Sequence, residues 1–117
     1  MSKTFTRILI AVISPLLSVL PVKAQVVINE YSCANVSSIP DNYGEYNDWV
    51  ELYNGGPTAV NLVGYYMSDK AGNLQQWAFP SGSIAPGAYL KVICSKRNIV
   101  ASGFFHINFS LTQCKPW

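Results

Sequence analysis

The sequence has few of the residue patterns on which enzymes and nucleic-acid-binding proteins depend. It contains a single histidine, His106, and no Gly-x-Ser-x-Gly turn that would expose a nucleophilic serine. Its basic residues are scattered except for one short run, residues 95–97 (SKR), which is too small a basic face to recruit a phosphate backbone. The sequence therefore argues against catalysis by this chain and against a nucleic-acid partner.

Cysteine is also scarce, with Cys33, Cys94 and Cys114 as its only occurrences. No two of them form a close Cys-x-x-Cys pair, so a zinc site that combines them with His106 is not favoured, and no cofactor is expected. In an oxidising compartment these residues allow one disulfide and one spare thiol, with the pairing left open. Some of them could equally be small buried hydrophobic residues on strands.

Long apolar runs are confined to the N-terminus. Residues 8–22 form an apolar run of 15 residues, which follows Lys3 and Arg7 and is followed by small or aliphatic residues up to Ala24. This three-part arrangement is typical of a secretory signal peptide. We therefore predict a signal peptide over residues 1–24, with cleavage after Ala24.

The same run is a poor candidate for a membrane anchor. It is shorter than the roughly 20 residues that span a bilayer, and two prolines interrupt it. The mature chain, residues 25–117, would be secreted to the extracellular space or the cell surface without a transmembrane anchor. It keeps five basic and six acidic residues, a net charge of −1.

The mature chain shows no sustained helical periodicity. Short segments of strand chemistry alternate with Gly, Pro, Asn and Asp. The predicted strands cover residues 26–33, 48–54, 59–69 (one or two strands bent at Gly64), 75–80, 88–95 and 104–111, and the predicted turns cover 70–75 and 81–87. Strands this short, with turns every 8 to 12 residues, predict an all-β sandwich or barrel in one domain.

Alternation within the strands predicts which side chains share a face. In residues 48–54, Val50 and Leu52 would face one side, and Trp49, Glu51 and Tyr53 the other. Two further strands would bury every second residue, namely Leu90, Val92 and Cys94 in one and Phe105, Ile107, Phe109 and Leu111 in the other.

Taken in order, several of these segments resemble the lamin tail domain as it occurs in exported bacterial proteins. The segments are VVINEY, DNYGEYNDWVELYN, VNLVGYYMSDKAGNLQQWAFP, SIAPGAYLKVICS and HINFSLT, which together span residues 26–112. The resemblance implies an immunoglobulin-like antiparallel β-sandwich over residues 25–117, with no catalytic residues. It also implies that further strands follow the last segment, so we expect this domain to be incomplete at its C-terminus, with an open sheet edge through which copies could self-associate.

Residues 41–56 (DNYGEYNDWVELYNGG) hold four of the six acidic residues in the chain. As an enzyme site, two of Asp41, Glu45, Asp48 and Glu51 would need a cleft that separates their pKa values. As a calcium site the stretch supplies oxygens but not EF-hand spacing. We favour a structural interpretation, in which Asp, Asn and Gly form a turn, Asp48 caps backbone N–H groups, and no catalytic or metal-binding residue is assigned.

Two functions from different classes fit these observations. The first is an exported, non-catalytic β-sandwich module that binds or tethers protein or cell-surface material. The second is the N-terminal accessory segment of a larger secreted enzyme, hydrolase or spore-coat kinase-like, whose catalytic domain lies outside this chain. Bacterial lamin tail domains beside such enzyme domains suggest the second function by analogy alone.

Overall fold

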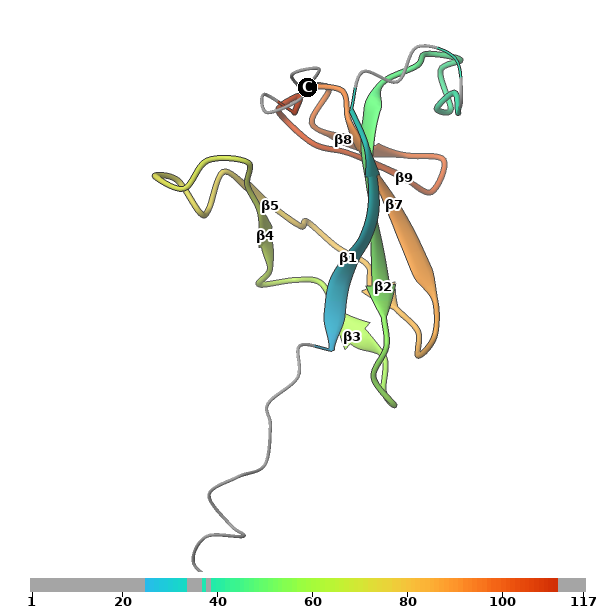
Figure 1. Ribbon diagram of the computed structural model, residues 1–117, viewed down its shortest axis with the longest axis vertical. Coiled ribbons are helices and arrows are strands. Elements are labelled where there is room, and N and C mark those ends of the chain that lie inside the picture. Colours follow the sequence, from blue (N-terminus) through green and yellow to red (C-terminus); the bar gives the residue numbers. More distant parts are fainter. Residues whose placement is uncertain (1–24, 34–36, 38, 112–117) are drawn as a thin grey trace, which may run out of the picture.

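The computed structural model describes residues 25–33, 37 and 39–111, in which all regular structure is β (Figure 1). The larger layer is a five-stranded sheet of order β1-β2-β7-β9-β8. Its strands are β1 (Val26–Ser32), β2 (Asp48–Asn54), β7 (Tyr89–Cys94), β9 (Phe104–His106) and β8 (Ile99–Ala101). All neighbours in this sheet are antiparallel except β7 and β9, which are parallel.

The second layer consists of two short ribbons. One pairs β3 (Val60–Asn61) with β6 (Ser83–Ile84), and the other pairs β4 (Tyr66–Met67) with β5 (Trp77–Ala78). Figure 1 shows β4 and β5 standing apart from the sheet edge at β1. The predicted all-β, immunoglobulin-like sandwich is therefore confirmed, with the parallel β7–β9 pair as an addition.

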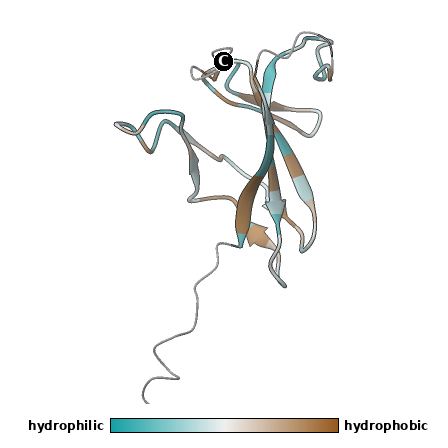
Figure 2. Ribbon diagram, in the orientation of Figure 1, coloured by the Kyte–Doolittle hydropathy of each residue, from teal (hydrophilic) through white to brown (hydrophobic). Residues whose placement is uncertain are grey.

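The core lies between the sheet and the ribbons. Figure 2 shows β3 and long stretches of β1 and β7 as hydrophobic, and the loop between β4 and β5 as mainly hydrophilic. The buried cluster comprises Val50, Leu52, Leu62, Trp77, Phe79, Ile84, Val92, Cys94, Phe105, Ile107 and Phe109. The predicted alternation is confirmed, because Val50 and Leu52 point into this cluster while Glu51 and Tyr53 stay half-buried on the opposite face. Large rings supply much of this small core.

Asn54 joins the two layers by polar contacts at the end of β2. Its side chain is fully buried, and Nδ2 donates to the carbonyls of Thr58 and Ile84, both at 2.8 Å. Its Oδ1 accepts from the Gly56 amide at 2.9 Å. The amide group thereby satisfies three backbone groups that would otherwise be left without partners inside the protein.

Two predicted elements differ from the structure. Residues 81–87 were predicted as a turn, but β6 lies within them, because Ile84 inserts into the core and pairs with Val60. Residues 104–111 were predicted as one strand, but the strand ends at His106. Phe109 is nevertheless buried, so the alternation gave the correct core positions beyond the end of the strand.

Strand β8 was not predicted. It is an edge strand that forms between two tight connections, in which Lys96, Asn98 and Ser102 adopt positive φ values of 67°, 52° and 51°. Asn visits this left-handed region more readily than Lys or Ser does. The polar residues 95–97 gave no indication that another strand follows them. A solvated turn and a connection between two strands have the same composition.

The cysteines divide into two environments. Cys33 is disulfide-bonded, whereas Cys94 is a free, buried thiol. Cys114 and the predicted signal peptide, residues 1–24, lie outside the described residues. Within the described part of the chain, no helix has the length and hydropathy needed to cross a bilayer.

Candidate functional site

The outer face of the five-stranded sheet, turned away from the ribbons, carries three cross-strand rows of side chains. The register of β1, β2 and β7 defines them as Val27–Tyr53–Tyr89, Glu30–Glu51–Lys91 and Ser32–Trp49–Ile93. We call the first the aromatic row and the second the charged row. Trp49, Glu51 and Tyr53 share this face, as the sequence predicted.

The aromatic row is open to solvent. Val27 is 43% exposed and Tyr89 is 58% exposed. The rings of Tyr53 and Tyr89 lie 4.7 Å apart between centroids and are tilted by 30°, so they form one continuous platform. Tyrosine presents a large, stiff contact area with a polar tip, which suits an intermolecular contact.

The charged row contains an electrostatic conflict. A β-bulge between Ile28 and Glu30 sets Glu30 directly opposite Glu51, where like charges destabilise a strand pair. Lys91 lies opposite Glu51 on the other side, yet its Nζ sits 4.2 Å from the centroid of the Trp49 ring. Within the described residues, neither Glu30 nor Glu51 forms an ion pair.

Residues 41–47, the acidic loop, are organised around Asp41. Its Oδ1 accepts from the backbone amides of Tyr43 (2.9 Å) and Glu45 (3.0 Å), and its Oδ2 accepts from Asn47 Nδ2 (2.9 Å). Gly44, with φ of 74°, closes the turn, and its backbone N–H donates a hydrogen bond to the Asp41 carbonyl at 3.0 Å. The loop donates to its own carboxylate, which supports the structural interpretation of this stretch.

The acidic loop is fastened to the sheet through His106, whose side chain is fully buried. Its Nε2 lies 2.7 Å from Asn42 Oδ1 and its Nδ1 lies 2.8 Å from Ser95 Oγ. The neutral tautomer protonated at Nε2 satisfies both contacts, since the Asn42 oxygen accepts and the Ser95 hydroxyl donates. The Tyr43 ring packs edge-on against His106, with centroids 5.4 Å apart.

The Arg97 side chain makes two contacts with the acidic loop. Its guanidinium lies 4.2 Å from the centroid of the Tyr43 ring, and Nη2 pairs with Glu45 Oε1 at 2.6 Å. The sequence had indicated neither these contacts nor the His106 network, because the residues that meet here are up to 64 positions apart. Their only sequence signal was a lone histidine in an aromatic run.

These contacts can be compared with the enzyme and calcium-site interpretations of residues 41–51. Asp41 and Glu45 are bound to loop donors and to Arg97, and His106 has no exposed surface from which to exchange a proton with a substrate. Burial, followed by the charges of Asp48 and Asp69, raises the pKa of the Cys94 thiol to about 12, which keeps it protonated and unreactive. Within the described residues, no group of three or more His, Cys, Asp or Glu side chains is placed to hold a metal ion.

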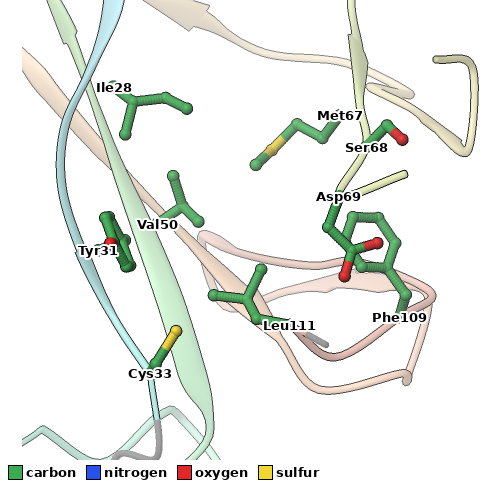
Figure 3. Close-up of a pocket in the computed structure, with 9 residues that line it drawn as sticks. All are labelled: Ile28, Tyr31, Cys33, Val50, Met67, Ser68, Asp69, Phe109 and Leu111. Atoms are coloured by element: carbon green, nitrogen blue, oxygen red, sulfur yellow. The ribbon is translucent and has the colours of Figure 1, made fainter. Parts of the chain in front are cut away.

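An apolar groove of about 230 Å³ lies on the inner side of the sheet, between β1 and β4 (Figure 3). Its walls are Ile28, Tyr31, Cys33, Val50, Met67, Ser68, Asp69, Phe109 and Leu111. Figure 3 shows Met67 facing Ile28 and Val50 across the groove. The β-bulge between Ile28 and Glu30 shifts the alternation by one residue, so that Ile28 and Tyr31 share the inner face of β1, opposite Leu52 and Val50.

The His106 network predicts that stability falls as the solution is acidified. Burial lowers the pKa of His106 from its ordinary value of 6.5, while the nearby charges of Asp41 and Glu45 raise it and that of Arg97 lowers it further. The unfolded chain therefore binds a proton at a pH where the folded chain does not. The free energy of unfolding should drop as pH falls through 6.5 and then level off below the folded pKa.

Asp41 should cause a second decrease in the free energy of unfolding at lower pH. Burial alone would raise its pKa, but hydrogen bonds from Glu45, Asn47 and Tyr43, together with His106, hold it below the ordinary value of 3.8. Its contribution is complete above pH 3.8 and is lost as pH falls through the folded pKa. Urea unfolding at a series of pH values measures both steps, and a His106→Gln variant that retained the upper step would contradict the assignment.

Together these features define an immunoglobulin-like β-sandwich module with an open aromatic face. The profile of the Lamin Tail Domain family matches residues 21–113, and the chain belongs to this family. The resemblance seen in the sequence is therefore confirmed, and the family is one of non-catalytic modules. No curated protein and no solved structure matches the chain.

Proposed function

We propose that this protein is an exported, non-catalytic module that binds a protein or other cell-surface material through the outer face of its five-stranded sheet. The observation that carries this proposal is the aromatic row. Its half-buried Tyr53 and exposed Tyr89 pack their rings together on a sheet, where little ordering entropy is lost on binding. The family's non-catalytic character is consistent with this role.

Export is the second part of the proposal. The apolar run of residues 8–22, its basic flank and the small residues up to Ala24 support it. Material recovered from outside the producing cells should have the mass of a chain that begins at Gln25. A mass that still includes residues 1–24 would contradict export by signal cleavage.

Photo-crosslinking in the producing cells tests the binding face. We expect the change Tyr89→benzoylphenylalanine to give a discrete heavier adduct on illumination, because position 89 lies on the aromatic row. The matched control is Tyr66→benzoylphenylalanine, since Tyr66 is 46% exposed but belongs to the β4–β5 ribbon. No adduct at position 89, or equal adducts at both positions, would contradict the proposed face.

A further inference from the structure

We propose that the outer face recognises an arginine side chain of a protein partner, with the guanidinium held between the Glu30–Glu51 carboxylates and the Tyr53–Tyr89 platform. This inference rests on the proposed function and names the chemistry of its partner. Two independent features carry it: the net negative charge of the charged row, and the adjoining aromatic row.

With two carboxylates and one ammonium group, the charged row keeps a net charge of −1, and within the described residues neither carboxylate forms an ion pair. The β-bulge at Ile28/Glu30 brings Glu30 opposite Glu51, at a cost in stability to this strand pair. Asn29 Nδ2 donates to Glu51 Oε1 at 3.0 Å, which orients this carboxylate without neutralising it. A cation from outside would relieve the repulsion, so the face is complementary to positive charge.

Lys91 would be the natural partner of Glu51, because the two residues are directly opposite on β2 and β7. Its ammonium group instead lies over Trp49. Trp49 is itself buried, and its indole N–H has no hydrogen-bond partner among the described residues. The lysine therefore leans toward the row of Trp49 and away from the aromatic row.

The neighbouring aromatic row selects the kind of cation. Residues 51 and 53 are successive on the same face of β2, so Glu51 and Tyr53 are neighbours on the outer face. A guanidinium is planar, stacks on aromatic faces and pairs with carboxylates through two parallel N–H groups. A divalent metal ion would gain nothing from the rings and would find only two carboxylates here. Arg97 shows the same combination inside the protein, with its guanidinium over Tyr43 and paired with Glu45.

The test titrates the isotope-labelled mature chain with the peptide acetyl-Gly-Arg-Gly-Arg-Gly-amide and follows backbone amide shifts. The reference probe is the same peptide with citrulline for arginine, which keeps the shape and removes the charge. We expect the arginine peptide to shift amides of β1, β2 and β7, and to bind at least about fivefold more tightly than the citrulline peptide. Its affinity should fall as salt is raised, because the carboxylates are exposed to solvent.

Variants locate the contact. Glu30→Gln combined with Glu51→Gln should reduce binding of the arginine peptide to the level of the citrulline peptide, and Tyr89→Ser should weaken it at least about fivefold. Tyr66→Ser is the matched aromatic control and should bind as the unaltered chain does. The amide shifts of buried Val92 and Ile107 report whether each variant keeps its fold.

Three results would overturn the inference: equal affinity for the two peptides, no binding of either, or shifts confined to residues outside the outer face. Each is distinguishable from failure of the proposed function. An adduct at position 89 but not at position 66 in cells, alongside any of these results, would show that the face binds a partner of different chemistry. Absence of that adduct would count against the face itself.

Discussion

Replacing Asn54 by aspartate should lower the free energy of unfolding by about 3–5 kcal/mol. The side chain is fully buried, and its Nδ2 donates to two carbonyls. A carboxylate has no N–H to donate, so Asn54→Asp would set a negative charge against the oxygens of Thr58 and Ile84. The loss is comparable to the whole stability of a marginal domain, roughly 5–15 kcal/mol.

The matched control is Asn61→Asp, which makes the same chemical change at an exposed site. Asn61 uses only its Oδ1, to accept from the Val63 amide at 3.0 Å, and a carboxylate oxygen can do the same. Urea unfolding should show this control within about 0.5 kcal/mol of the unaltered chain. Equal losses in the two variants would mean that the Asn54 contacts do not join the layers as described.

Replacing Gly82 by alanine should cost about 2–4 kcal/mol, through two separate effects. The backbone at Gly82 has a φ of 104°, which a residue with a Cβ adopts only under strain. A Cβ there would also lie 2.7 Å from Cζ of Phe105, a buried ring of the core. The ring cannot move away freely, because it packs against Phe79 with centroids 5.9 Å apart.

Gly64→Ala separates the two effects. Gly64 has a similar φ of 95°, but a Cβ at this position would meet no atom within 4 Å. This variant should therefore lose only the strain energy, about 1–2 kcal/mol. The difference between the two variants measures the clash with Phe105, and it should disappear in a Phe105→Ala background. If Gly64→Ala proved as costly as Gly82→Ala, packing around Phe105 would not be the cause.

Longer strands were predictable from the sequence because they alternate over enough positions to reveal their faces. Residues 48–54 became β2 with the predicted bounds, and Val50 and Leu52 point into the core as expected. Strand β6 spans only Ser83–Ile84, which is too short to alternate, and the surrounding Gly and Pro indicated a turn. Its pairing with β3 depends on contacts distant in sequence.

The candidate site, like the fold, was only partly predictable from the sequence. Alternation placed Trp49, Glu51 and Tyr53 on one face, but the charged row also requires the register of β1, and a bulge sets that register. A bulge of one residue shifts the alternation within β1, but this strand is too short for the shift to be recognised in the sequence. The His106 network was equally hidden, since a buried histidine reveals its role only when its partners, Asn42 and Ser95, are brought to it by folding.

The groove between β1 and β4 has walls of unequal rigidity. One wall belongs to the five-stranded sheet, while the other stands on the β4–β5 ribbon, which is held by two register pairs and flanked by the exposed Tyr65 and Leu74. Amide hydrogens of this ribbon should exchange with solvent before those of β2 and β7, because only two register pairs join its strands. An opening of the ribbon would carry Met67 away from Ile28 and Val50, so a guest that fills the groove should slow amide exchange in the ribbon.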